Sequence, residues 1–127
     1  MGRLRPDFIE RAETFSHRVV DVADALASDR RSSRVVDQLI GAGTSVSANL
    51  CESDEALSRA DFCKHVGISL KELSETRFWL RFASKRSWIP ASRLDPLPIE
   101  AAEIRLILGS ILNKSRVNKV RKKTVPN

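Results

Sequence analysis

The apolar residues of this chain recur in steps of three and four along four segments, and this periodicity restricts the fold more than any other feature. The clearest repeat, near the N-terminus, comprises Phe8, Ala12, Phe15, Val19, Val22 and Leu26. Such spacing places apolar side chains on one stripe of a helix, whereas a strand requires strict alternation. The sequence therefore predicts an all-α fold, an antiparallel up-down-up-down bundle of four helices.

Capping residues and prolines indicate where the first three helices begin. Pro6 suits the first turn of a helix expected over residues 6–28, because its missing N–H is not needed there. The second helix is expected to begin near Ser33, where a serine offers an N-cap. Ser58 forms a capping-box pattern with Asp61 and predicts the start of the third helix.

The fourth helix follows the longest connection of the chain, residues 85–98. Asp95 and Pro96 have the pattern of an N-cap and a first-turn proline, and they predict that the helix begins there. We expect a bundle domain at residues 1–113 and a basic, frayed or disordered tail at residues 114–127. The expected central stripe of the fourth helix consists of Ile99, Ala102, Leu106 and Gly109, and it is flanked by Ile104, Ile107, Leu108 and Ile111.

Two glycines, Gly41 and Gly43, lie inside the second helix. Glycine in a helix interior costs about 1 kcal/mol relative to alanine, so its presence needs a compensating gain. Close approach of a partner helix is the usual gain. We therefore expect the second helix to pack closely against a neighbour at these positions.

The third helix carries an apolar face that is two stripes wide. The main stripe consists of Phe62, Val66, Ser69, Leu73, Thr76, Leu80 and Ala83. The second stripe consists of Ile68, Glu72, Glu75, Trp79 and Phe82. A face of this width contacts more than one neighbour, and one neighbour can be another subunit, so we expect a homo-oligomer.

Polar residues interrupt the apolar faces of the second and third helices. Buried polar groups cost stability unless they are paired, so they either specify a structure or serve a function. We interpret them as a structural polar network that fixes helix register and partner choice. A catalytic role for the two glutamates of the third helix is the alternative. The four residues are Asn49, Glu52, Glu72 and Glu75.

Several site classes lack their sequence signatures. His17 and His65 are the only histidines, and neither has the Glu-x-x-His pattern of a dinuclear metal site in a bundle. Cys51 and Cys63 are too few for a secreted disulfide scaffold. No apolar run is long enough to span a membrane, and the N-terminus has no signal-peptide pattern. We therefore expect a cytoplasmic protein without a metal, cofactor or catalytic site.

Positive charge is concentrated at the C-terminus. The net charge is +6, and the segment after residue 113 contains six cations and no acid. Such a segment is typical of nucleic-acid contacts, and the alternative is a solvated tail that only aids solubility. On the third helix, Lys71, Arg81 and Lys85 share a face with Phe78, a pattern suited to single-stranded nucleic acid. The six tail cations are Lys114, Arg116, Lys119, Arg121, Lys122 and Lys123.

A series of short motifs in fixed order resembles the 23S rRNA intervening-sequence protein family, and the resemblance covers nearly the whole chain. Two positions depart from the pattern: Gly41 stands where an arginine or other polar residue is expected, and Cys51 where an alanine is expected. The motifs are Gln38-Leu39, Ala42-Gly43-Thr44-Ser45-Val46, Ala48-Asn49, Glu52, Ser58, Asp61-Phe62, Lys64, Ile68, Leu70-Lys71-Glu72, Glu75-Thr76 and Trp79-Leu80.

The resemblance implies four-helix protomers that assemble into a ring-like homopentamer. It also implies similarity to the accessory variability protein of diversity-generating retroelements, a basic pentamer that binds nucleic acid and partners a reverse transcriptase. No catalytic activity is established for the family.

Three functions remain open at this point. The first is a non-enzymatic, oligomeric protein that binds RNA or DNA or acts as an adaptor. The second is a purely structural scaffold for a protein partner. The third is an enzyme that uses Glu72 and Glu75.

Overall fold

The chain is helical throughout its described part, as the apolar periodicity predicts. The computed structural model describes the backbone of residues 4–124 and the side chains of residues 4–116. No strand occurs within that backbone range. The helices are α1 (Pro6–Ser28), α2 (Ser33–Asp54), α3 (Arg59–Lys85), the four-residue α4 (Ala91–Leu94) and α5 (Leu97–Thr124).

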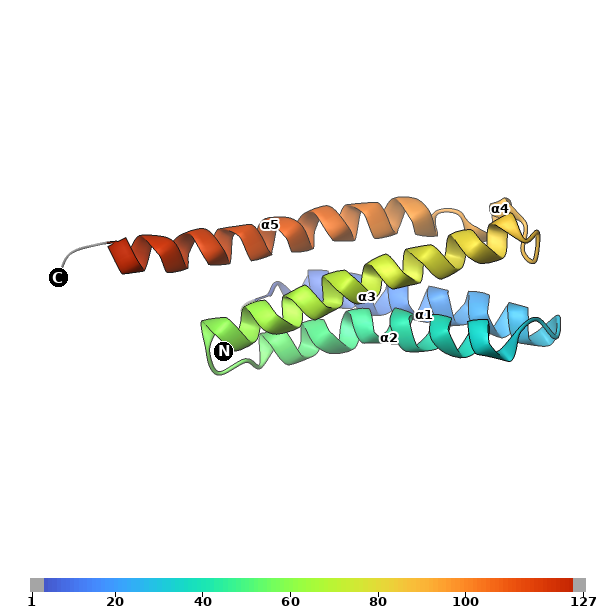
Figure 1. The fold of residues 1–127 in the computed structure, drawn as a ribbon, viewed down its shortest axis with the longest axis horizontal. Coiled ribbons are helices and arrows are strands. Elements are labelled where there is room, and N and C mark those ends of the chain that lie inside the picture. The colour runs from blue at the N-terminus through green and yellow to red at the C-terminus, as the bar shows by residue number, and fades with distance from the viewer. Residues whose placement is uncertain (1–3, 125–127) are drawn as a thin grey trace.

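The long helices lie side by side in an elongated molecule. Helices α1, α2 and α3 form a compact unit, and α5 lies along α3 (Figure 1). The C-terminal part of α5 extends past the ends of the other helices (Figure 1). The helix passes without a break through position 114, where the sequence predicts the bundle's boundary. The division into a bundle and a basic tail stays a prediction.

The first three helices begin where the sequence predicts. Pro6 occupies the first turn of α1. The Ser32 hydroxyl accepts a hydrogen bond from the Val35 N–H at 3.4 Å and caps α2. The Ser58 hydroxyl accepts one from the Asp61 N–H at 3.0 Å and caps α3. These caps satisfy backbone donors that a helix leaves unpaired at its N-terminus.

The predicted start of the last helix is wrong. Asp95 follows the C-terminus of α4, a helix that the sequence analysis missed, and the Asp95–Pro96 peptide is cis. Helix α5 begins at Leu97, and the Pro96 carbonyl accepts the Glu100 N–H at 3.0 Å. The first-turn proline is therefore Pro98 rather than Pro96.

The predicted central stripe of α5 is also wrong, although the flanking residues Ile104 and Leu108 are buried. Ile99 is 65% exposed and Leu106 is 69% exposed. At about 100° per residue, the buried side chains lie on nearly the opposite side of the helix from these two. Apolar residues occur on both sides of α5, so periodicity alone could not identify the buried one. The buried residues are Leu97, Ala101, Ile104, Leu108 and Leu112.

Helices α1 and α2 approach each other closely at Gly43. A Cβ atom added at Gly43 would lie 2.5 Å from Cγ1 of Val19. The expectation of close packing is therefore confirmed for Gly43. For Gly41 the same expectation is wrong in the single chain, because an added Cβ would meet nothing within 4 Å.

Buried serine hydroxyls connect the same helices. Ser16 of α1 donates to the Gly43 carbonyl at 2.7 Å and lies 2.7 Å from the hydroxyl of Ser47. Ser69 of α3 donates to the Val46 carbonyl at 2.7 Å. Each buried hydroxyl thus has a partner, which removes the cost of burying it.

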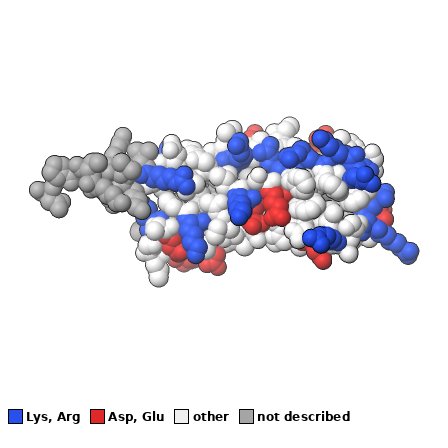
Figure 2. Space-filling model, viewed as in Figure 1, with Lys and Arg blue, Asp and Glu red and all other residues white. Residues whose placement is uncertain are grey.

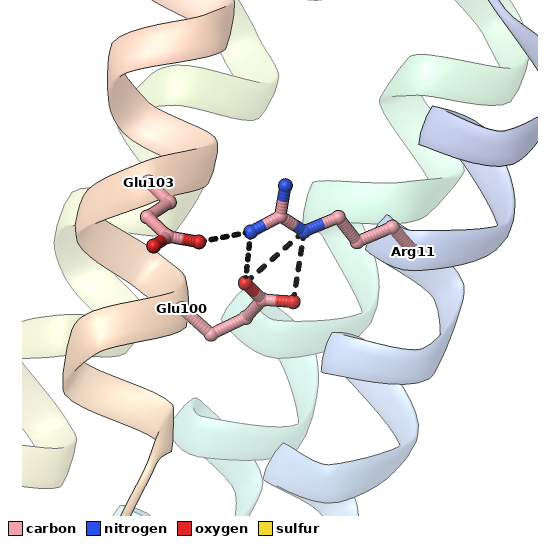
Figure 3. A network of polar contacts seen from close by, with 3 residues as sticks. All are labelled: Arg11, Glu100 and Glu103. Atoms are coloured by element: carbon pink, nitrogen blue, oxygen red, sulfur yellow. Dashed lines mark hydrogen bonds and ion pairs between the residues drawn. The ribbon is translucent and has the colours of Figure 1, made fainter.

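Arg11 of α1 joins α5 to the rest of the molecule (Figure 3). Its Nε donates to both carboxylate oxygens of Glu100, at 3.1 and 3.0 Å, and its Nη2 contacts Glu100 and Glu103. The guanidinium lowers the pKa of Glu100, and the two carboxylates raise the pKa of Arg11. A guanidinium–carboxylate contact with two hydrogen bonds pairs the charges and also fixes the relative orientation of the two side chains.

We predict that Gly43→Ala destabilises the protein by about 1–3 kcal/mol, because the new methyl group must displace Val19 or separate α1 from α2. Urea unfolding measures the effect. Gly41→Ala is the matched control in the same helix and should raise the unfolding free energy by up to about 1 kcal/mol. Equal stability changes for the two variants would contradict the close contact.

Candidate nucleic-acid interface

The second half of α3 and the connection that follows it are strongly basic. Between Glu75 and Asp95 the sequence contains five Lys or Arg residues and no acid. Figure 2 shows Lys and Arg side chains gathered over the end of the molecule that carries α4. The five residues are Arg77, Arg81, Lys85, Arg86 and Arg93.

Three of these cations line a cavity between α3 and the α4–α5 segment. Its volume is about 270 Å³. Among the described residues, Arg77, Arg81 and Lys85 form no ion pair, although the Asp95 carboxylate also lines the cavity. The remaining lining residues are Leu80, Ser84, Ala91, Leu94 and Pro98.

Aromatic side chains lie beside these cations on α3. Phe78 is 45% exposed and Phe82 is 36% exposed, which is unusual for large apolar side chains. Phe82 contacts Trp79 and Trp88 edge to face, with ring centroids 5.9 and 5.8 Å apart. The cluster thus holds two exposed rings on a rigid helix, next to positive charge.

The structure separates the predicted nucleic-acid contacts into two groups. Lys71, Arg81 and Lys85 are exposed on α3. Lys114 and Arg116 are exposed on α5. They belong to the C-terminal half of this helix, which runs away from the end of the molecule that carries α4 (Figure 1). The remaining predicted cations belong to the backbone of α5, but their side chains lie outside the described residues: Lys119, Arg121, Lys122 and Lys123.

Sequence reasoning missed Arg77 as a member of the α3 cluster. Arg77 lies one turn before Arg81 and lines the same cavity. The signal that would have revealed it is the absence of acids between Glu75 and Asp95.

The predicted polar network is not one cluster. Glu52 is exposed, so its expected burial is wrong. Asn49 is half-buried and donates to the Ser45 carbonyl at 2.9 Å. Its Oδ1 lies 3.1 Å from Nδ1 of His65, a partner on α3 that the sequence analysis did not propose. Asn49 thus connects α2 to α3 through a histidine, and not through one of the glutamates that the sequence analysis proposed.

Glu72 and Glu75 interact with each other on α3. Burial, together with the charge of Glu75 and a hydrogen bond to it, raises the pKa of Glu72. Glu75 accepts a hydrogen bond from the Trp79 indole at 3.4 Å. Neither carboxylate lines the cavity between α3 and α4. The hydrogen bond from the Trp79 indole therefore connects the two glutamates to the aromatic cluster.

The described residues contain neither a metal cluster nor a membrane helix. Within residues 4–116, no three His, Cys, Asp or Glu side chains gather in a way that suits a metal ion. No helix in the described range is both long and apolar enough to cross a membrane.

The motifs on α2 and α3 can now be compared with known families. The family described as 23S rRNA-intervening sequence protein matches residues 6–110. The chain belongs to this family. The match spans α1 to α4 and about half of α5, and it includes the cavity between α3 and α4. The family assignment made from the sequence motifs is therefore confirmed.

A solved structure from the same group is similar in fold. It is a protein of unknown function from the S23 ribosomal protein family of Bacteroides thetaiotaomicron. The two chains are 30% identical with a TM-score of 0.78, and the match covers 83% of this chain and 97% of the other. A comparison with curated proteins finds no match.

We predict that Glu72→Gln removes one contribution by which the protein loses stability as pH rises. A raised pKa means that the folded state binds the Glu72 proton more tightly than the unfolded chain does. The unfolding free energy therefore falls as pH rises from the ordinary glutamate value through the raised one, and the variant lacks this fall.

Urea midpoints at about pH 4 and about pH 7 test the prediction. Glu52→Gln, an exposed change on α2, is the control for the loss of one glutamate charge. A Glu72→Gln variant that is less stable than the parent at about pH 7 would show that the ionised carboxylate stabilises the fold.

Proposed function

We propose that this protein is a non-enzymatic, self-associating cytoplasmic protein that binds single-stranded nucleic acid through α3 and the basic end of α5. The observation that supports binding most directly is the set of three cations without ion pairs, Arg77, Arg81 and Lys85, beside the exposed ring of Phe78. Cations bind phosphates, and aromatic rings stack on unpaired bases.

The charge distribution supports the same interface. Residues 1–58 carry seven Lys or Arg and ten Asp or Glu, whereas residues 59–127 carry fifteen and six. The positive charge therefore belongs to the half of the chain that forms α3 and α5. A polyanion is attracted to this half and repelled by the other, which orients its approach.

Self-association has a separate basis, a groove between α1 and α5 whose lining is half apolar and half polar or charged. Its volume is about 610 Å³, and Leu106 and Ile107 of α5 face Leu4 and Phe8 across it. With Leu106 69% exposed and Ile99 65% exposed, α5 leaves apolar surface uncovered in the single chain. We propose that a second copy covers it, in the ring-like homopentamer of up-down-up-down bundles that the family resemblance implies.

The alternatives differ in what α3 contacts. A protein partner, such as a reverse transcriptase, would use the same aromatic and basic surface for an adaptor or scaffold role. An enzyme would require Glu72 or Glu75 to face a substrate, and the raised pKa of Glu72 is the observation that favours this option. The unpaired cations favour a nucleic acid over both.

We predict that Leu106→Glu disrupts self-association. The substitution places a charge among the apolar residues of the groove, and because the side chain is already exposed it should leave the fold of the single chain intact. Sedimentation velocity of full-length protein measures the change. Leu57→Glu is the matched control, since Leu57 is 99% exposed and does not line the groove. A parent protein that sediments as a monomer would contradict the proposal.

We predict that the basic end of α5 contributes to a steep salt dependence of binding. Replacing Lys119, Arg121, Lys122 and Lys123 by Gln removes four charges, so the slope of log affinity against log salt should fall by up to roughly 3 for a single strand. Fluorescence anisotropy with labelled RNA and DNA measures it. Arg34→Gln on α2 is the control. An unchanged slope would mean that this end does not contact phosphates.

A further inference from the structure

The cavity between α3 and α4 is a concave site with a wall on α3 that carries three cations and a mostly apolar wall that also contains Asp95. Arg77, Arg81 and Lys85 occupy successive turns of α3, so their side chains lie on one face. Leu94 of α4 and Pro98 of α5 are on the other side. At about 270 Å³ the cavity is slightly smaller than typical sites for drug-sized ligands, which are about 300–1,000 Å³. It suits one small charged group and the atoms attached to it.

The charged wall is unfavourable when the cavity is empty. Like charges four residues apart on a helix repel each other, and no acid pairs with these three cations among the described residues. The contrast with Arg11 is informative, because that arginine is held by two glutamates. An anion in the cavity would relieve the repulsion and accept several charge-assisted hydrogen bonds.

The number of cations indicates which anion fits. A phosphate inside a nucleic-acid strand carries one negative charge, whereas a terminal phosphate monoester carries about −1.5 to −2 at pH 7. Three cations match the monoester better. The Asp95 carboxylate, which only accepts hydrogen bonds, would repel a bare anion but can accept one from a neighbouring sugar hydroxyl.

We infer that this cavity binds a phosphate monoester on a sugar, and that its ligand is the phosphorylated 5′ end of a single RNA strand. Arg77, Arg81 and Lys85 would hold the phosphate, and Asp95 a ribose hydroxyl. The exposed ring of Phe78 lies next to Arg77 on α3, where it can stack on a following base. The choice of a strand end rests on the proposed function and the choice of RNA on the ribose hydroxyl at Asp95, whereas the phosphate site rests on neither.

The test compares ligands that differ only in the terminal phosphate. Full-length protein is titrated with a short labelled RNA bearing a 5′-phosphate and with the same RNA bearing a 5′-hydroxyl. We expect about tenfold tighter binding of the phosphorylated strand, as charge-assisted hydrogen bonds imply. A nucleoside 5′-monophosphate, used as a competitor, distinguishes a free nucleotide from a strand end.

Two arginine variants test whether the residues that line the cavity hold the terminal phosphate. Arg77→Gln and, separately, the exposed Arg81→Gln should bring the ratio of the two affinities to about one. Lys64→Gln is the control, since Lys64 is exposed on α3 and does not line the cavity. Thermal melting confirms that each variant is folded, and Arg81→Gln still tests the site if Arg77→Gln fails to fold.

The outcomes separate the two proposals. Equal affinities for the phosphate and hydroxyl ends would overturn this inference and leave nucleic-acid binding intact. Failure of both strands to bind, with an Arg77-dependent affinity for the monophosphate, would support the phosphate site and overturn the proposed function. Failure of all three ligands to bind would overturn both. A preference for the 5′-phosphate that survives both arginine variants would also overturn the assignment to this cavity.

Discussion

The close approach of α1 and α2 at Gly43 is the contact on which the rest of the structure depends. Only a residue without a side chain lets Val19 lie against the α2 backbone, and the same approach brings Ser16 within 2.7 Å of the Gly43 carbonyl. Three residues further along α2, the Ser69 hydroxyl donates to the Val46 carbonyl and positions α3. The glycine cost in helix propensity is thus offset by packing and hydrogen bonds that connect three helices.

Helix α5 is held differently from the other long helices. One side buries a regular apolar stripe that includes Ile104 and Leu108, and Arg11 fixes its position relative to α1 through Glu100. The opposite side carries apolar residues that the described part of the chain leaves exposed, such as Leu106. A helix with apolar residues on two sides favours a second contact outside the chain, and this is the physical basis of the proposed self-association.

The candidate interface arises from the positions of charges rather than from their total. Acids are present in α3, but Glu72 and Glu75 interact with each other, and Glu75 accepts a hydrogen bond from Trp79. Among the described residues, Arg77, Arg81 and Lys85 in the C-terminal half of α3 therefore have no ion pair. Because this basic face packs against α4, the cations line a cavity. The size and shape of the cavity then favour some anions over others.

The sequence by itself determined the four long helices, the starts of the first three and the family, because helical periodicity, capping residues and short motifs are local patterns. It also marked Arg81, Lys85 and Phe78 as a basic and aromatic face of α3. Only the tertiary structure decided which side of α5 is buried, that Glu52 is exposed, and that Arg77 lines a cavity with α4. The physical reason is that a side chain's burial and partners depend on the neighbouring helix, and residues distant in the sequence select that neighbour.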